Sequence, residues 1–175
     1  HELIKRITEG GVLPQITSCS PGWIKFVEHF YPQLLPNVSS CKSPQQMFGA
    51  VAKTYYAEEA GIDPAKMVVV SIMPCTAKKF EKTRPYQNAA GEGIQDIDYA
   101  LTSRELARFI KRQGIMFNEL KDEAFDAPMG IASGAGLIFG ATGGVMEAAL
   151  RTAYEMITGE PVKELEFTDV RAVEG

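Results

Sequence analysis

Apolar side chains recur at the spacing of one helix face in several stretches of the chain. The clearest stripe begins after Pro21, and proline favours the first position of a helix. The stripe consists of Trp23, Phe26, Val27 and Phe30. By the same criterion the sequence predicts helices over residues 1–9, 43–60 and 144–157, and one that begins near Thr102.

One run of apolar residues predicts a strand instead. Met67–Met73 is short, rich in valine and bounded by residues that break secondary structure, which is typical of a strand covered on both faces. Further strands are predicted over residues 12–17, 97–101 and 164–170. Because helices alternate with strands, the sequence predicts an α/β fold in which parallel sheets are flanked by helices. We expect residues 1–175 to form a single unit.

The composition excludes several classes of protein. The chain is 45% hydrophobic and 23% charged with a net charge of −4, which is ordinary for a soluble protein and does not suggest a nucleic-acid partner. No stretch approaches the roughly 20 apolar residues of a membrane span, and no signal peptide is visible. The chain starts at His1 rather than at a methionine, and we expect an excerpt of a longer protein.

Three widely spaced cysteines, Cys19, Cys41 and Cys75, do not make the even set that a disulfide framework needs. They indicate reduced thiols and a cytoplasmic protein. The two histidines, His1 and His29, are too far apart for a zinc site by spacing.

Cys75 follows the predicted strand Met67–Met73 almost at once, and parallel α/β sheets build their sites at the carboxyl ends of strands. The charges of Lys78 and Lys79, and a helix that starts near Ala77, would favour the thiolate, which is the form that binds metal. The alternative is a buried, unreactive cysteine at the end of the strand.

Cys19 occupies a similar position, between the strand predicted over residues 12–17 and the helix that begins at Pro21. Two cysteines at such junctions could converge above one sheet and hold a metal. Coincidence is the alternative, because junctions between strands and helices are common.

The segment from Ser133 to Gly144 is rich in glycine, which permits close approach of the backbone. Its spacing is GxGxxxG rather than GxGxxG and no clear strand precedes it, so we favour a packed loop over a nucleotide site. The segment Ser39–Pro44 offers hydroxyls, a thiol and an ammonium before a predicted helix, and helix capping is its simpler explanation.

Two motifs, Thr17–Trp23 and Met73–Glu81, resemble the first two of three signature motifs of the [FeFe]-hydrogenase catalytic domain. Ser39–Gln46 and Phe139–Arg151 are also similar to that family. The resemblance runs from Glu2 to Gly175 without a large gap, and the motifs are long and unusual.

The resemblance implies two lobes, each built on a parallel sheet with helices, and an H-cluster between them. This cofactor is a [4Fe-4S] cluster joined through a cysteine to a two-iron centre with CO, cyanide and a bridging dithiolate amine. The implied reaction is the reversible reduction of protons to dihydrogen, in anaerobic hydrogen metabolism. In the family four cysteines hold the cluster, and the last two lie in a third motif that this sequence does not reach.

The resemblance also implies roles for individual residues. Cys75 matches the second cluster ligand, and Lys78 matches the lysine that hydrogen-bonds a cyanide, for which a buried ammonium is a strong donor. The proton path is matched by Cys19, Ser39 and Glu2, whose side chains can pass protons along hydrogen bonds. Residues that match neighbours of the cofactor are Pro44, Gln45, Met73, Pro74 and Phe139.

One position departs from the family pattern. The first motif of the family has two adjacent cysteines, a proton relay and then a cluster ligand, whereas this chain has Cys19-Ser20. Strict register would make Ser20 a ligand through an alkoxide, although soft thiolates suit iron–sulfur clusters better. Alternatively, Cys19 takes the ligand position and Ser20 lies near the proton path, or Cys41 contributes.

Electrons would arrive from iron–sulfur clusters in upstream domains or other subunits, through a ferredoxin or a nicotinamide-linked partner. Two other functions stay open. One is a hydrogenase-like protein of cytosolic iron–sulfur assembly, which Lys78 and Gln45 argue against because they serve the two-iron centre. The other is a hydrogen sensor, which Cys19 argues against because sensors tend to alter the relay position.

Overall fold

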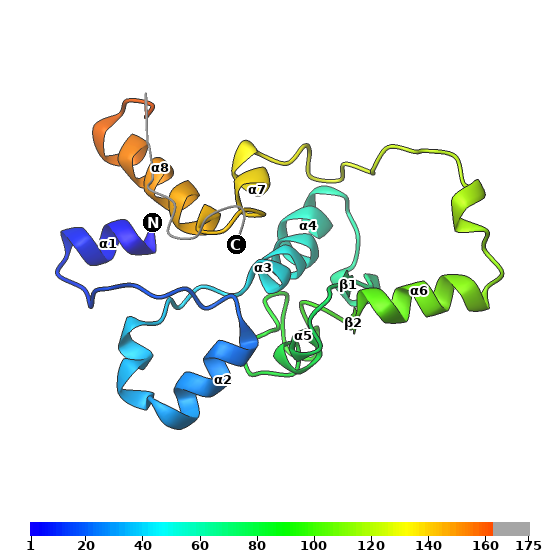
Figure 1. The fold of residues 1–175 in the computed structure, drawn as a ribbon, viewed down its shortest axis with the longest axis horizontal. Coiled ribbons are helices and arrows are strands. Elements are labelled where there is room, and N and C mark those ends of the chain that lie inside the picture. Colours follow the sequence, from blue (N-terminus) through cyan, green and yellow to red (C-terminus); the bar gives the residue numbers. More distant parts are fainter. Residues whose placement is uncertain (163–175) are drawn as a thin grey trace. The chain divides into compact units, whose positions relative to one another are not determined.

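Helices and short strands follow one another along the chain in the order that the apolar pattern predicts, except that no strand precedes α2 (Pro21–Phe30) (Figure 1). The computed structural model describes residues 1–162. Their contacts divide the chain into two units: one is Pro14–Pro128, and the other joins His1–Leu13 to the segment that begins at Met129.

A parallel sheet of β1 (Val70–Ile72) and β2 (Tyr99–Leu101) lies in the unit Pro14–Pro128. The connection between parallel strands must cross over, and α5 (Ala77–Glu81) lies on that connection. The Met73 N–H donates to the carbonyl oxygen at the end of β2 at 2.9 Å, which continues the ladder by one bond. The predicted α/β class is therefore confirmed.

The prediction that the strand at residues 67–73 is covered on both faces is wrong. The strand is shorter, Val70 and Ile72 are 48% and 41% exposed, and Val68 before it is 66% exposed. Within residues 1–162 the sheet has two strands, so too little structure surrounds β1 to bury its apolar side chains.

Residues 12–17 do not form the predicted strand. Ile16 alone makes a parallel bridge, with Val38, and Pro14 interrupts the segment because proline has no N–H to donate to a ladder. The strand predicted over residues 164–170 lies outside the part of the chain that the structure describes.

The predicted helices of this unit are present. The helical segments are α2 (Pro21–Phe30), η1 (Pro32–Asn37), α3 (Pro44–Val51), η2 (Ala52–Tyr56), α4 (Ala57–Glu59), η3 (Pro64–Lys66), α6 (Ser103–Arg112) and η4 (Phe117–Glu119). The predicted helix over residues 43–60 runs from α3 through the π-helical η2 into α4. Thr102 and Glu105 form the capping box of α6. No helix of residues 1–162 is both long and apolar enough to cross a bilayer.

The helix α3 packs against the backbone that leads into β2. A Cβ atom at Gly49 would lie 2.2 Å from the Asp96 carbonyl oxygen, so this approach requires glycine. The Asp96 carboxylate is fully buried and lies 2.5 Å from the Lys42 ammonium. A second pair joins Lys53 to Asp98 at 2.7 Å. These pairs fix the segment before β2 against the α3–η2 region.

The other unit contains α1 (Glu2–Thr8), α7 (Gly134–Ile138) and α8 (Gly144–Thr158). Apolar side chains from α1 and α8, among them Leu3 and Val145, line a cavity of about 270 Å³. The prediction that the glycine-rich segment is a packed loop is wrong for most of its length: the segment includes the short helix α7, Leu137 is 85% exposed, and within the segment only Gly144 is buried. A Cβ atom at Gly144 would lie 1.7 Å from the Ile138 carbonyl oxygen, so the start of α8 lies directly against the end of α7.

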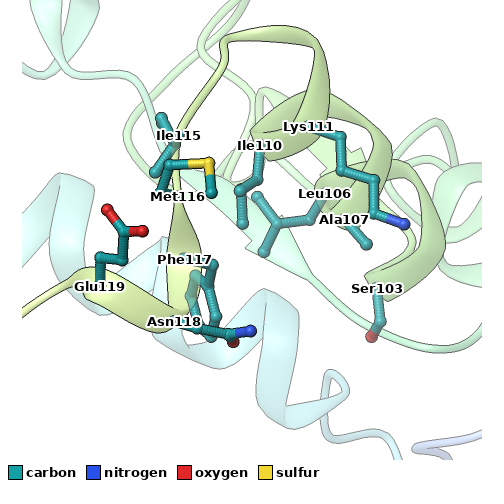
Figure 2. A pocket seen from close by; sticks show the side chains of 10 residues that line it. All are labelled: Ser103, Leu106, Ala107, Ile110, Lys111, Ile115, Met116, Phe117, Asn118 and Glu119. Carbon is teal, nitrogen blue, oxygen red and sulfur yellow. The ribbon is translucent and has the colours of Figure 1, made fainter.

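A cavity of about 630 Å³ lies between α6 and η4 (Figure 2). Leu106 and Ile110 of α6 face Met116 and Phe117 across it. Residues 115–119 partly cover the apolar face of α6 across this cavity. No residue predicted for the site lines the cavity.

Candidate functional site

Cys75 lies between the end of β1 and the start of α5, as the sequence predicts. The residue is exposed, so the alternative of a buried cysteine is wrong. The Lys78 N–H donates to the Cys75 carbonyl oxygen at 3.4 Å, which places both residues on one turn of the chain. The carboxyl end of the strand thus presents a thiol next to a helix that carries a lysine.

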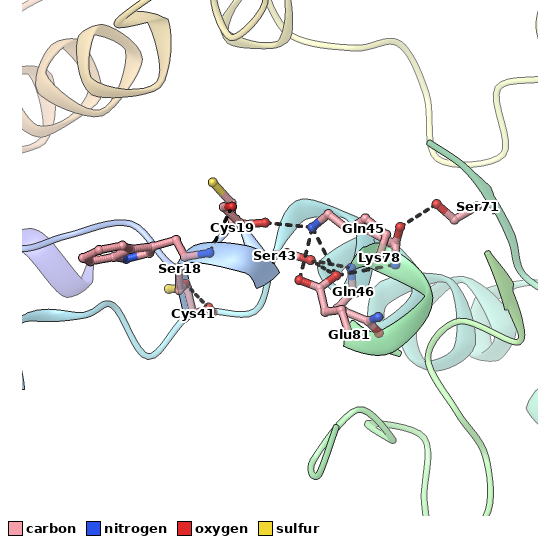
Figure 3. Close-up of polar contacts among 11 residues, drawn as sticks. Ser18, Cys19, Cys41, Ser43, Gln45, Gln46, Ser71, Lys78 and Glu81 are labelled. Atoms are coloured by element: carbon pink, nitrogen blue, oxygen red, sulfur yellow. Dashed lines mark hydrogen bonds and ion pairs between the residues drawn. The ribbon is translucent and has the colours of Figure 1, made fainter. Parts of the chain in front are cut away.

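Lys78 connects this turn to the first motif. Lys78 is only 8% exposed, and its Nζ donates to the Cys19 carbonyl oxygen at 2.7 Å (Figure 3). The same Nζ lies 3.1 Å from both carboxylate oxygens of Glu81, which balances the buried charge. The structure therefore brings together Cys19 and Lys78, which are 59 residues apart in the sequence.

Glu81 is the centre of a buried polar network that also reaches α3 and β1 (Figure 3). Its Oε2 accepts a hydrogen bond from the Ser43 hydroxyl at 2.8 Å and a longer one from the Gln45 amide at 3.5 Å. The Gln45 Oε1 accepts from the Ser71 hydroxyl at 2.7 Å. Gln45 is 7% exposed and Glu81 5%, so these bonds form away from water.

The structure distinguishes Cys19 from Ser20 by their local roles. Ser20 is the N-cap of α2, and its hydroxyl accepts a hydrogen bond from the Trp23 N–H at 3.5 Å. Cys19 is half-buried, directly before this cap. Cys41 is exposed, and its carbonyl oxygen accepts from the Ser18 hydroxyl at 2.5 Å, so its backbone lies beside the first motif.

The other predicted residues of this unit lie on the segments around the network. Pro44 is the first residue of α3 and is exposed, Met73 is half-buried, and Pro74 is exposed. The Ser39 hydroxyl accepts a hydrogen bond from the Cys41 N–H at 3.2 Å, which ends the stretch before α3 in a tight turn.

Glu2 and Phe139 lie in the other unit. The Glu2 carboxylate, 20% exposed, pairs with Arg6 one helical turn later, with distances of 2.8 and 3.2 Å to two guanidinium nitrogens. Phe139 follows α7, is 46% exposed, and lines the cavity of that unit. Arg6 was not among the predicted site residues, although its spacing of four from Glu2 indicates an ion pair.

Ion pairs hold α5 and the segment after it in place. Lys79 lies 2.5 Å from Glu105 of α6, and the hydrogen bond from Lys79, with those from Thr102, lowers the pKa of Glu105 to about 2. Arg84 pairs with Glu28 of α2, and this hydrogen bond lowers the pKa of Glu28 and raises that of Arg84. Ion pairs thus connect α5, which follows Cys75, to α6 and connect the segment after α5 to α2.

Glu81, Ser43 and Ser71 take part in the network, but the sequence-based prediction did not include them. An acid three residues after Lys78 was a usable signal, because residues at that spacing are neighbours on a helix. The serines gave no such signal, since their partners are 38 and 26 residues away.

In residues 1–162 no group of three or more His, Cys, Asp or Glu side chains could hold a metal ion. The thiols of Cys75 and Cys19 can nevertheless supply part of a larger ligand set. A buried ammonium, here beside the Cys19 backbone and on the same turn as Cys75, suits a metal group that carries negative charge. The donor set therefore fits an iron–sulfur group whose remaining ligands come from elsewhere.

The chain is similar to proteins that are named as hydrogenases. It is 57% identical over 163 residues to the NADP-reducing hydrogenase subunit HndD of Solidesulfovibrio fructosivorans. The matched region covers 93% of this chain and 28% of that protein. It is 51% identical over 176 residues to the periplasmic [Fe] hydrogenase large subunit of Nitratidesulfovibrio vulgaris, with coverage of 99% and 41%. A more distant relative, 31% identical over 163 residues, is the cytosolic iron-sulfur assembly component 3 of Bos taurus, with coverage of 91% and 34%.

A solved structure agrees with this similarity. A variant of apo [FeFe]-hydrogenase HydA1 from Chlamydomonas reinhardtii shares 50% sequence identity and a TM-score of 0.80, over 99% of this chain and 44% of that one. The chain spans less than half the length of each of these relatives. The family described as "Iron only hydrogenase large subunit, C-terminal domain" matches residues 1–175, and this chain belongs to that family.

Proposed function

We propose that the protein containing this chain is an iron hydrogenase that catalyses the reversible reduction of protons to dihydrogen at an H-cluster. The observation that supports this most directly is the buried Lys78 ammonium, 2.7 Å from the Cys19 carbonyl oxygen and on the same turn as the exposed Cys75. Hydrogenases at 57% and 51% identity support the same reaction.

When bound, the H-cluster supplies the redox chemistry, and the protein supplies ligands, orientation and charge. In this proposal Cys75 holds the cluster through its thiolate. Lys78 donates a hydrogen bond to a cyanide and offsets its negative charge. The other neighbours of the cofactor in this proposal are the polar side chain of Gln45 and the residues Pro44, Met73, Pro74 and Phe139.

For the first ligand position we favour Cys19 over Ser20. The Ser20 hydroxyl caps α2, whereas a cysteine thiolate is the softer ligand and the better match for iron–sulfur chemistry. Ser20 then lies nearest the proton path. In the strict register the roles are reversed, with Ser20 as ligand and Cys19 as proton relay.

Protons would reach the site along a path that includes Glu2 and Ser39. Cys19 is the innermost member of this path in the strict register, and Ser20 takes that place if Cys19 is the ligand. The side chains of Glu, Ser and Cys can each accept a proton and then donate it onward. The Glu2 carboxylate is held by Arg6 and the Ser39 hydroxyl by the Cys41 N–H, so both groups have defined positions within their own units.

We propose that electrons come from iron–sulfur partners, through a ferredoxin or a nicotinamide-linked subunit. The name of the NADP-reducing relative supports the second source. We propose a cytoplasmic, anaerobic setting, because reduced thiols suit it, although another relative is named as periplasmic.

The alternative function is iron–sulfur assembly without hydrogen chemistry. The 31% identical assembly component supports it, but the hydrogenases are much more similar to this chain. Burial of Lys78 and Gln45 in one network also favours the hydrogenase, because these residues would serve the two-iron centre. A hydrogen sensor is a further alternative, which the presence of Cys19 disfavours.

The proposal can be tested with the full-length protein, matured with its cluster. We expect hydrogen evolution from a reduced viologen dye, and we expect Cys75→Ala to lose both this activity and most of the bound iron. Cys41→Ala is the matched control and should retain both. Iron content unchanged by Cys75→Ala would exclude Cys75 as a ligand, and a fully loaded wild-type protein without hydrogen activity would exclude the reaction.

A further inference from the structure

We propose that Glu81 is a positioning residue that holds the Lys78 ammonium in its direction before the anionic cofactor binds. This inference rests on the proposed function, since Lys78 is taken as the residue that meets the cofactor. Glu81 itself was not assigned a role by the sequence motifs, and it touches neither of the candidate thiols.

The Lys78 ammonium has as many acceptors within reach as it has N–H donors. A lysine ammonium has three N–H donors. In this structure Lys78 has three acceptors within reach: the Cys19 carbonyl oxygen at 2.7 Å and the two Glu81 oxygens at 3.1 Å. All three donors are therefore engaged, and a new acceptor must take over a donor that one of these oxygens now uses.

Of these acceptors, a Glu81 oxygen can release Lys78 at a lower free-energy cost than the Cys19 carbonyl oxygen can. The Cys19 carbonyl gives the shorter bond, at 2.7 Å. Glu81 keeps other donors when one of its bonds to Lys78 is lost, because Ser43 lies 2.8 Å and Gln45 3.5 Å from its Oε2. Its Oε1 is the oxygen for which only the contact to Lys78 is described. We therefore assign the Glu81 Oε1 contact as the one that gives way to the cofactor.

Lys78 and Glu81 are a buried pair of opposite charges. Lys78 is 8% exposed and Glu81 5%, so removing either partner would leave a charge in a poorly solvated site. Glu81 balances the ammonium and ties it to α3 through Ser43. These contacts fix the direction in which Lys78 meets Cys19, and a donor held in one direction is what preorganised binding requires.

The test compares three variants of the full-length protein: Glu81→Gln, Glu81→Asp and Glu105→Gln. Glu81→Gln keeps the shape and removes the charge. Glu81→Asp keeps the charge on a shorter side chain and tests rescue. Glu105→Gln is the matched control, because Glu105 pairs with the adjacent lysine, Lys79, on the exposed side of α5.

In the metal-free protein we measure backbone hydrogen exchange of the peptide that contains Cys19. Glu81→Gln should speed exchange there by about tenfold, because Lys78 is no longer held at the Cys19 carbonyl. Glu81→Asp should restore part of the protection, with exchange between that of Glu81→Gln and that of wild type, and Glu105→Gln should match wild type. Equal exchange in Glu81→Gln and wild type would overturn the proposal. If Glu81→Gln does not fold, the exchange of Glu81→Asp is compared with that of the control variant, Glu105→Gln. Equal exchange in these two variants would contradict the proposal.

In the matured protein we measure the infrared stretching bands of the cyanide ligands. Glu81→Gln should shift a cyanide band relative to wild type, while Glu105→Gln should not, and identical spectra in all variants would contradict the positioning role. A wild-type protein that shows no cyanide bands would contradict the proposed function. The exchange measurement would still judge Glu81, because it needs no cofactor.

Discussion

At the scale of single residues, the site is made of pairs that meet across long stretches of sequence. Lys78 reaches Cys19 at 2.7 Å, and Gln45 reaches Ser71 at the same distance. Cys75 and Lys78, the residues on which the sequence-based prediction depends most, do share one turn. Their neighbourhood could be predicted from spacing alone, whereas the contact with Cys19 could not, because nothing local specifies it.

Replacing Cys19 and Ser20 separately distinguishes the two ligand assignments. We expect Cys19→Ala in the full-length protein to lose iron and Ser20→Ala to retain it. Ser20→Ala should also lower the free energy of unfolding by about 1 kcal/mol, because α2 loses its N-cap. Iron analysis and denaturant unfolding measure the two effects. Retention of the cluster in Cys19→Ala, with loss of turnover, would instead identify Cys19 as the proton relay.

Gly49 is a second position where the addition of a single carbon atom is expected to change the stability of the fold. A methyl group there would lie 2.2 Å from the Asp96 carbonyl oxygen, so we expect Gly49→Ala to lower the free energy of unfolding by about 1–3 kcal/mol. Gly22→Ala is the control, since a Cβ atom at Gly22 meets nothing within 4 Å. Denaturant unfolding measures both, and equal stability of the two variants would show that α3 can move away from the segment before β2.

At the scale of elements, helix boundaries are well specified and strands are not. The start of α6 follows from Thr102 and Glu105, whose capping interactions are local. Predicted helices therefore begin close to the observed residues. The extent and burial of β1 depend on what packs around it, which is tertiary information, so the prediction of a strand covered on both faces failed at Val70 and Ile72.

The capping box of α6 predicts a dependence on pH. The pKa of Glu105 is lowered from 4.5 to about 2, chiefly by the hydrogen bond from Lys79. A carboxylate whose pKa falls on folding stabilises the folded state above its unfolded pKa. That contribution is lost as the pH falls from about 4.5 towards about 2.

The thermal midpoints of wild type and Glu105→Gln measure this contribution. The wild type should be more stable near neutral pH, and the difference should shrink between about pH 4.5 and about pH 2. The difference should be small, because solvent screens an exposed pair. A difference that does not vary with pH would show that Glu105 stabilises α6 by its shape and not by its charge.

At the scale of the whole molecule, this chain spans only part of the length of the hydrogenases that it resembles. It spans 28% to 44% of their length, and residues 1–162 contain no group of three metal-binding side chains. The family could be identified from two motifs, Thr17–Trp23 and Met73–Glu81. The convergence of these motifs at Lys78 depends on the packing of α2, α3 and α5, which no single segment encodes.

The ligand count gives a prediction for the gene. If the H-cluster assignment is right, the coding sequence after residue 175 should contain two further cysteines, three or so residues apart in a glycine-rich setting. Sequencing the gene over about the next 80 codons tests this. A coding sequence without such a pair would leave the cluster short of ligands and would favour a different cofactor.

The hydroxyl of Ser71 has a consequence for how this protein folds. Ser71 is the middle residue of β1, opposite Ala100, and its side chain reaches Gln45. A slip of the strand by one position would point a valine or an isoleucine at that amide and would turn the hydroxyl to the other face of the sheet. Correct pairing of the two strands therefore keeps the Ser71 hydroxyl at Gln45, and a misaligned pair of strands would leave the buried Gln45 Oε1 without this donor.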